Sequence, residues 1–320
     1  MATLGDIGEV AAIERLTGRL GPQGGVLQGP GDDCAVIAGN GVDWLLTSDP
    51  VIAGVHFNVD AAPRCIGHKA VGRVLSDVAA MGGVPRYAVV DVVAPAALDV
   101  EVLDEVYTGV LELAERHGLA VVGGDLAEGG ALELHVFAMG SVPHGRAVLR
   151  SGARAGDAIY VTGRLGGSAA GRHLAFDPRV AEGAWLRETV RPSAMIDLSD
   201  GLATDLRHVV RASGVGARVE LARLPLSEAA QAGNGRTALE CGLFDGEDFE
   251  LLFCIPVGED AFPHAAWRER FDLPCTRIGC IVAGQGDITG VDAAGQEQPI
   301  ERSAFEHFRS GAGTVREDGV

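Results

Sequence analysis

Short polar clusters that carry aspartate stand at the ends of apolar runs along the chain. The clusters are GDD (31–33), TSD (47–49), LSD (75–77), GGD (123–125), DLSD (197–200) and GED (246–248). Any one of them is typical of a turn or a helix cap, since Gly-Asp and Ser-Asp pairs form both readily. Their recurrence suggests more, because carboxylates gathered at one end of a sheet raise one another's pKa unless a cation neutralises them.

The ligand chemistry of these clusters favours Mg²⁺ over Zn²⁺. Their donors are carboxylate and hydroxyl oxygens, whereas zinc sites rely mainly on cysteine and histidine. The chain shows no Cys-x-x-Cys pair. Mg²⁺ usually binds through a few carboxylates together with substrate phosphates. The pattern therefore predicts a metal-dependent phosphate site, and separate structural turns remain the alternative that spacing alone leaves open.

Composition excludes the common lysine-based nucleotide sites. Lys69 is the single lysine among 26 basic residues, and it lies in neither a GxxxxGK[ST] sequence nor an apolar strand. If the chain binds nucleotide phosphates, it must do so through metal ions, arginines and backbone amides. Ser199 and Asp200 precede a predicted helix whose amides can hold phosphate oxygens. Arg150 is a candidate phosphate ligand and His56 a candidate substrate contact; a surface arginine and a packed histidine are the alternatives.

The charge balance argues against polyanionic partners. The 320 residues carry a net charge of −18 without a basic cluster, which disfavours binding to nucleic acid or anionic membranes. No apolar run reaches the roughly 18–20 residues that span a bilayer, and the opening residues show no secretory pattern. We therefore expect a cytoplasmic protein with reduced cysteines.

Apolar strand patterns alternate with helical ones, which predicts an α/β or mixed α+β fold. Helices are expected over 6–20, 66–81, 100–117, 178–190 and 201–213, the first of them amphipathic. Strands are expected over 44–49, 87–95, 119–125, 132–142, 158–163, 195–200, 219–226, 249–256 and 275–282. A stretch rich in Pro, Gly and Arg over 143–157 predicts a boundary between two domains, 1–145 and 146–320.

The chain resembles the thiamine-monophosphate kinase family, within the superfamily of aminoimidazole ribonucleotide synthetase and selenophosphate synthetase. The matching stretches, in the family's order, are GPGDDCAVI (29–37), LLTSDPVIAGVHF (45–57), HKAVGRVLSDVAAMGGVP (68–85), VVGGD (121–125), GRAVLRSGARAGDAIYVTGRLGGSAAG (145–171), SAMIDLSDGLATDL (193–206), GEDFELLF (246–253) and SAFEHF (303–308). The combination of GVHF, SDxAAMG, DLSDGL and GEDFELL is specific.

The resemblance implies ATP-dependent phosphorylation of thiamine monophosphate to thiamine diphosphate, assisted by several Mg²⁺ ions and without a covalent enzyme nucleophile. It implies a homodimer that pairs through an N-terminal α/β domain binding ATP and Mg²⁺, completed by a C-terminal α/β domain with a mixed sheet. Metal-binding positions of the family match Asp33, Thr47, Ser48, Asp49, Asp77, Asp125, Asp197 and Asp200. ATP-binding positions match Tyr107, Gly124, Asp125, Arg150 and Ser199, and substrate-binding positions match His56, Glu247 and Phe305.

The chain also departs from the family's pattern. Leu126 and Ala127 follow GGD where the family usually has two threonines, and Val74 replaces an asparagine. Phe305 stands where tryptophan or tyrosine is frequent. The linker over 171–176 is short and lacks a helix of the C-terminal domain. No carboxylate is lost. The alternatives are therefore a superfamily relative acting on another phosphorylated substrate and a non-catalytic nucleotide-binding homologue.

Overall fold

The computed structural model describes residues 2–21, 23–233, 235–256 and 262–301. Its first sheet contains β1 (Val26–Gln28), β2 (Ala35–Ala38), β3 (Val42–Ile52), β4 (Val84–Ala94), β5 (Ala120–Gly123), β6 (Leu126–Glu128) and β7 (Glu133–Pro143). The second contains β8 (Ala158–Thr162), β9 (Ala194–Asp197), β10 (Gly216–Glu220), β11 (Leu251–Ile255), β12 (Cys275–Val282), β13 (Ile288–Val291) and β14 (Glu297–Pro299). The α-helices are α1 (Leu4–Thr17), α2 (Pro63–Ala80), α3 (Val100–Arg116), α4 (Val180–Trp185), α5 (Leu202–Ser213), α6 (Glu228–Ala232), α7 (Ala238–Phe244) and α8 (His264–Arg270).

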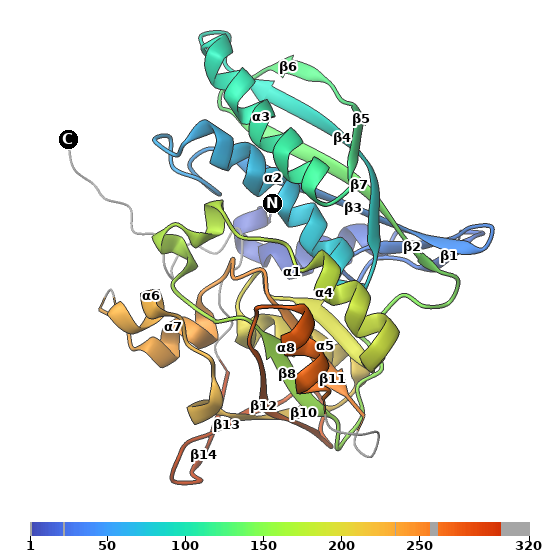
Figure 1. Ribbon diagram of the computed structural model, residues 1–320, viewed down its shortest axis with the longest axis vertical. Coiled ribbons are helices and arrows are strands. Elements are labelled where there is room, and N and C mark those ends of the chain that lie inside the picture. Colours follow the sequence, from blue (N-terminus) through green and yellow to red (C-terminus); the bar gives the residue numbers. More distant parts are fainter. Residues whose placement is uncertain (1, 22, 234, 257–261, 302–320) are drawn as a thin grey trace.

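The two sheets lie one above the other in Figure 1, with α2 and α3 on the upper sheet. The first sheet has the order β1-β2-β3-β7-β4-β5, with β6 paired to β4, and the second has the order β14-β13-β10-β12-β8-β11-β9. In the second sheet β10 and β13 run parallel and their other neighbours antiparallel. The mixed C-terminal sheet that the resemblance implies is therefore confirmed. None of the described helices is long and apolar enough to cross a membrane.

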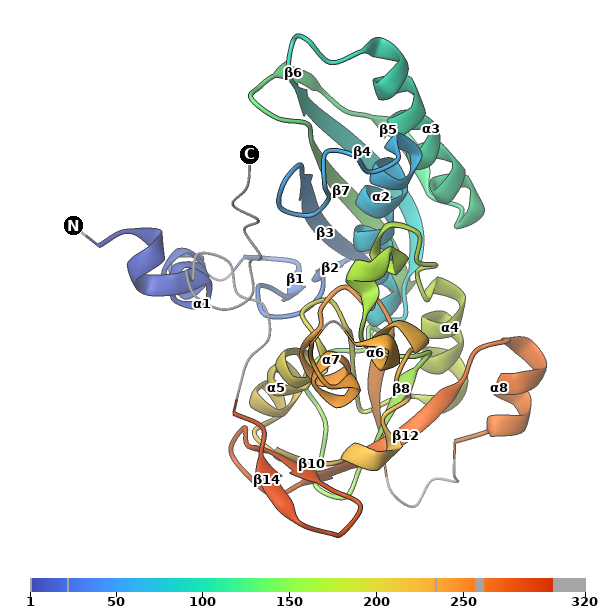
Figure 2. The same cartoon turned by 90° about the vertical axis from the view of Figure 1, so that its left-hand side faces the viewer.

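Most expected elements are present, but several differ in their bounds, and the strand expected over 44–49 continues to Ile52. The helix expected over 178–190 changes after α4 into a π turn, η3 (Leu186–Val190). The strand expected over 219–226 ends early, because a 3₁₀ turn, η4 (Leu221–Arg223), follows β10. Helix α1 forms, but its apolar side chains, such as Leu4 and Val10, remain about half exposed. Figure 2 shows that α1 lies to one side of the two sheets rather than packing on them.

Helix α2 is the element that both halves share. It packs against β3 and β7 of the first sheet and against β9 and α4 of the second half. Buried side chains of α2, such as Val71 and Leu75, belong to one apolar core together with Phe253 of β11 and Trp267 of α8. The core thus continues from one sheet to the other, which fixes the position of any side chain that α2 carries into the junction.

Two glycines allow α2 and α3 to approach each other closely. A Cβ atom on Gly67 would lie 1.9 Å from the Val106 carbonyl oxygen, and one on Gly109 would lie 2.0 Å from that of Arg64. Any other residue at either position would push the helices apart. The close contact leaves the opposite side of α2 free to face the second sheet.

Candidate active site

Helix α2 carries an acid into the junction between the sheets. Asp77 lies in its last turn, and the hydroxyl of Thr47 in β3 donates a hydrogen bond to its carboxylate. The preceding residue, Ser76, donates from its hydroxyl to Asp197 Oδ2 at 2.6 Å, at the end of β9. Two consecutive residues of α2 thus bring the carboxylate of Asp77 close to that of Asp197, which belongs to the second half.

Three carboxylates converge at this junction. Asp33, Asp77 and Asp197 each offer an oxygen, and these oxygens lie within 4.8 Å of one another. They come from the loop before β2, from α2 and from β9, and Asp49 of β3 is close enough for its charge to act on Asp77 and Asp197. The structure therefore brings together four of the acidic clusters that are far apart in the sequence.

Burial raises the pKa of all three carboxyl groups, and repulsion by neighbouring carboxylates adds to the shift of Asp77 and Asp197. Burial, followed by the charge of Asp33, raises the pKa of Asp197 to about 7. The pKa of Asp77 is raised well above its ordinary value by burial and then by Asp49 and Asp197. Burial also raises the pKa of Asp33, although Arg150 opposes the shift. The Oδ2 atom of Asp33 is buried without a hydrogen-bond partner. A cation at the cluster would relieve this repulsion.

Arg150 supplies part of the compensating charge. Its Nη2 lies 2.6 Å from Asp33 Oδ1, and its backbone N–H donates to Asp32 Oδ2 at 3.0 Å. Burial alone would lower the pKa of this guanidinium, but Asp33 raises it, so Arg150 stays charged. Its Nε atom is buried without a hydrogen-bond partner. Arg150 is thus a charged donor at the edge of the cluster.

A second group of possible ligands lies at the start of α5. Asp200, Asp205 and His208 offer atoms within 4.8 Å of one another. Burial, followed by the charge of Asp200, raises the pKa of Asp205 well above its ordinary value. Burial, followed by the charge of Arg150, lowers the pKa of His208 to about 4, so its ring is neutral at pH 7. A neutral imidazole beside carboxylates is able to ligate a metal.

Glu247 lies among basic side chains next to the acidic cluster. Its Oε1 is 2.6 Å from Lys69 Nζ and 3.6 Å from Arg73 Nη1, and its Oε2 is 3.1 Å from His173 Nδ1. Burial would raise the pKa of Glu247, but the hydrogen bonds with His173 and Lys69 lower it to about 2. Arg73 also binds Asp49 at 3.0 Å. Glu247 is therefore charged at pH 7 and connected to the cluster through Arg73.

Lys69 links the predicted substrate contacts His56 and Glu247. The Lys69 ammonium donates to the carbonyl oxygen of His56 and pairs with Glu247. The His56 ring is held by its own loop, because Nδ1 accepts a hydrogen bond from the Ile52 amide at 3.1 Å. Ser199 is close by, since its carbonyl oxygen accepts a hydrogen bond from the Glu247 amide at 2.7 Å.

Other predicted residues lie away from the carboxylate cluster. Side chains alternate along a strand, so Ser48 is exposed on the face of β3 opposite to Thr47 and Asp49. Gly124 borders Val90 of β4, three strands along from Asp49. This spacing places Gly124 about 14 Å from Asp49.

Three further predicted residues remain, namely Asp125, Tyr107 and Phe305. Asp125, next to Gly124, is exposed, and its carbonyl oxygen accepts a hydrogen bond from the Val92 amide at 2.8 Å. Tyr107 lies half-buried on α3. Phe305 falls outside the described residues.

Sequence reasoning missed several residues of the site. Arg73 stands one helical turn before Asp77, and Asp205 lies in the first turn of α5 after Asp200, so helical spacing is a usable signal for both. His173 belongs to an irregular segment without periodicity, and nothing in its local sequence indicates that it reaches Glu247.

Two family models together match most of the chain. The N-terminal domain of AIR synthase related proteins matches residues 31–142, and the C-terminal domain matches residues 154–292. A hydrogenase maturation protein, HypE in complex with ATP, shares the fold, with a TM-score of 0.70 at 20% identity over 93% of this chain and 96% of HypE.

Relatives with higher sequence identity to this chain identify the family more closely. The chain is 40% identical to the thiamine-monophosphate kinase of Rhodopirellula baltica, over 87% of this chain and 90% of that protein. It is 35% identical to the enzyme of Escherichia coli K12, over 88% and 91%. The structure of AaThiL complexed with AMPPCP and TMP matches with a TM-score of 0.79 at 30% identity, over 96% of this chain and 99% of AaThiL. The chain therefore belongs to the thiamine-monophosphate kinase family.

Proposed function

We propose that this chain transfers the terminal phosphoryl group of ATP to thiamine monophosphate and so forms thiamine diphosphate. Its relatives from Rhodopirellula baltica and Escherichia coli are thiamine-monophosphate kinases, and AaThiL is complexed with AMPPCP and TMP. The observation that carries the proposal is the convergence of Asp33, Asp77 and Asp197 between the two sheets, beside Arg150.

The residues present fit Mg²⁺. They are carboxylate oxygens with raised pKa values, and one of them, Asp33 Oδ2, is buried without a partner. Asp33, Asp77 and Asp197 would hold an ion, with Thr47 and Asp49 beside them. When bound, Mg²⁺ neutralises charge on the oxygens of the transferring phosphoryl group. Asp200 would serve a further ion in the second ligand group.

The chain's own residues orient the two phosphates. Arg150 is charged and its side chain is partly exposed, so it is suited to bind a phosphate oxygen of ATP. Backbone N–H groups after Ser199, at the start of α5, offer further donors. The phosphate of thiamine monophosphate is already anionic near neutral pH and needs no general base. Positioning and charge stabilisation therefore suffice for a direct in-line transfer without a phospho-enzyme.

The acceptor substrate is assigned to the other side of the site. Its thiazolium ring is cationic, and Glu247 is a charged carboxylate beside His56. The family resemblance supports the remaining assignments, namely Tyr107, Gly124 and Asp125 for ATP, Ser48 and Asp125 for metal, and Phe305 for the substrate. It also supports a cytoplasmic enzyme whose residues 1–145 and 146–320 form separate domains.

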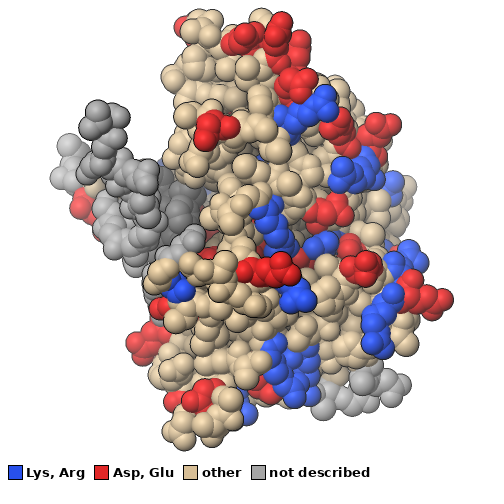
Figure 3. Space-filling model, turned by 60° about the vertical axis from the view of Figure 1, so that its left-hand side comes forward, with Lys and Arg blue, Asp and Glu red and all other residues tan. Residues whose placement is uncertain are grey.

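The open face of the first sheet supports a homodimer. Tyr87 of β4 is 48% exposed and Phe137 of β7 is 42% exposed. Leu46 and Tyr87 flank Met139 across β3, β7 and β4, so apolar side chains cover this face in adjacent rows. In Figure 3 acidic and basic side chains lie along the top and the right-hand side of the upper part, and mostly uncharged atoms lie to their left. A second copy of the sheet is the partner that the family resemblance implies.

We expect Asp77→Asn to abolish turnover and to stabilise the metal-free protein at alkaline pH. Because the folded-state pKa of Asp77 is raised above 3.8, the stability linked to its proton is present at lower pH. That stability is lost as the pH rises through the folded-state pKa of Asp77. The amide of the Asp77→Asn variant does not titrate, so the variant keeps its stability. In EDTA the variant should unfold at a higher temperature than the wild type at pH 8, with little difference at pH 4. Each kcal/mol added to the free energy of unfolding should raise the midpoint by roughly 2–4 °C.

The matched control is Asp43→Asn, a buried aspartate outside the site. Asp43 accepts a hydrogen bond from the Gly145 amide at 2.7 Å and lies 2.8 Å from His144 Nδ1. Its substitution should lower the unfolding midpoint and leave turnover unchanged. The metal assignment would be contradicted if the wild-type protein kept its full turnover in excess EDTA. It would also be contradicted if the Asp77→Asn protein unfolded far below the wild type at both pH values.

Glu247→Gln should raise the KM for thiamine monophosphate and change the KM for ATP much less. A partly buried charge pair is worth about 1 kcal/mol, so we expect an increase of roughly fivefold. Steady-state kinetics with each substrate varied in turn measures both constants. Glu188→Gln, which removes an exposed carboxylate paired with Arg187, is the control. Equal increases in both KM values would contradict the assignment of Glu247 to the acceptor.

We expect the protein to sediment as a dimer at micromolar concentration. Phe137→Asp places a charge on the open face of the first sheet and should shift the protein toward monomer. Leu111→Asp is the control, since Leu111 is 47% exposed on α3, away from that face. A stable wild-type monomer in analytical ultracentrifugation would refute the homodimer.

A further inference from the structure

The segment between β8 and α4 is short and is fixed against α2. It forms two 3₁₀ turns, η1 (Ser168–Ala170) and η2 (Arg172–Leu174), followed by Phe176. His68 Nε2 of α2 lies 2.6 Å from the Phe176 carbonyl oxygen. The Phe176 ring covers Gly72 so closely that a Cβ atom there would meet it at 2.6 Å. The helix that carries Asp77 therefore also determines where η2 lies.

The segment that carries Glu247 has an unfavourable backbone conformation. Glu247 has a φ angle of 65° and Phe249 one of 49°, which is the left-handed region that side chains other than glycine rarely adopt. Such residues persist where the surrounding structure holds them, and they are frequent at functional sites. Phe249 is held by stacking on Phe176, with ring centroids 4.0 Å apart and an interplanar angle of 16°.

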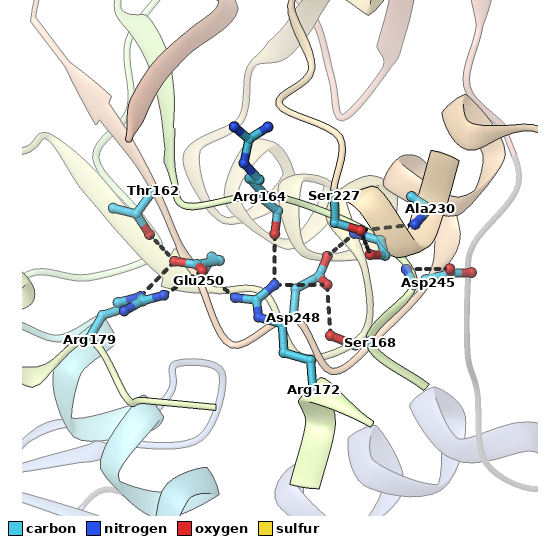
Figure 4. A network of polar contacts seen from close by, with 12 residues as sticks. Thr162, Arg164, Ser168, Arg172, Arg179, Ser227, Ala230, Asp245, Asp248 and Glu250 are labelled. Atoms are coloured by element: carbon cyan, nitrogen blue, oxygen red, sulfur yellow. Dashed lines mark hydrogen bonds and ion pairs between the residues drawn. The ribbon is translucent and has the colours of Figure 1, made fainter. Parts of the chain in front are cut away.

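Two buried carboxylates beside Glu247 anchor the same segment, and Arg172 joins them (Figure 4). Glu250 accepts hydrogen bonds from Arg172, from Thr162 at 2.7 Å and from two guanidinium nitrogens of Arg179 at 2.7 Å each. Arg172 Nη1 lies 3.6 Å from Asp248 Oδ1.

Asp248 is tied to the η1 turn as well. It accepts hydrogen bonds from the Gly166 amide at 2.8 Å and from the Ser168 hydroxyl at 3.0 Å. Asp248 and Glu250 are each 1% exposed, so their charges depend on these partners. Arg172 thus connects the turn to the strained segment at two positions.

The next residue, His173, contacts Glu247 itself. Its Nδ1 atom lies 3.1 Å from Glu247 Oε2 and 2.8 Å from Lys69 Nζ. We propose that Arg172 and His173 belong to the acceptor-substrate site, with Arg172 as a positioning residue for the Glu247 segment. His173 is then a specificity-determining residue that orients the Glu247 carboxylate toward a cationic acceptor. The inference rests on the proposed function, which assigns the acceptor to Glu247.

The contacts of Glu247 explain why its orientation matters. Lys69 and Arg73 both lie on the side of Oε1, whereas His173 lies on the side of Oε2. Lys69 donates to the His56 carbonyl and pairs with Glu247, which uses two of its three N–H groups. The charge of Glu247 is therefore already partly compensated. Attraction for a cationic ring then depends on the orientation of the Glu247 carboxylate. The contact between His173 and Oε2 restrains that orientation.

The test compares His173→Leu with His173→Asn. Loss of one hydrogen bond in His173→Leu should raise the KM for thiamine monophosphate by roughly three- to tenfold. The KM for ATP and kcat should stay near wild-type values. The Asn side chain places an amide nitrogen near the position of Nδ1 and should restore most of the affinity. His144→Leu is the matched control, because His144 Nδ1 lies 2.8 Å from Asp43 Oδ1 outside the site.

Arg172→Lys provides a second, independent variant. A lysine cannot bind Asp248 and Glu250 with the planar fork of a guanidinium, so the KM for thiamine monophosphate should rise while the KM for ATP stays constant. If His173→Leu does not fold, the Asn and Lys variants carry the test.

The outcomes separate the inference from the proposed function. With an active wild type, an unchanged acceptor KM in His173→Leu, or equal rises in both KM values, overturns the inference alone. If the wild type does not phosphorylate thiamine monophosphate, the proposed function fails and the inference falls with it.

Discussion

Carboxylates that repel one another are held together where the two sheets meet. Asp33, Asp77 and Asp197 present oxygens within 4.8 Å of one another. Hydrogen bonds from Thr47 and Ser76 fix Asp77 and Asp197 without adding positive charge. The pKa values of both carboxyl groups are raised because they are buried and lie close to other carboxylates. The arrangement favours protons or a cation at the junction, and a divalent cation would also attract the phosphates of a nucleotide.

Helix α2 connects this cluster to the acceptor side of the site. Lys69, Arg73 and Asp77 follow one another at intervals of four residues, so they lie along one face of the helix over about 12 Å. Lys69 holds Glu247, Arg73 contacts both Glu247 and Asp49, and Asp77 belongs to the cluster. A shift of α2 would therefore change the metal-binding and acceptor-binding parts of the site together.

The sequence was informative where a residue sits in a periodic element. The sequence pattern places Asp77 and Asp197 near the ends of elements, and the structure has them there, whereas β3 continues past Asp49 to Ile52. Their convergence could not be predicted from spacing, since it depends on how α2 packs between two sheets. Nor could the contact of His173 with Glu247, because a turn without periodicity carries it.

The proposed function requires the carboxylate cluster to bind a cation. Crystals grown with Mn²⁺ and a non-hydrolysable ATP analogue would test it through anomalous diffraction. We expect a Mn²⁺ peak within coordination distance of carboxylate oxygens of Asp33, Asp77 or Asp197, and the loss of that peak in Asp77→Asn crystals. Nucleotide bound in the wild type with anomalous peaks only at other sites would contradict the account.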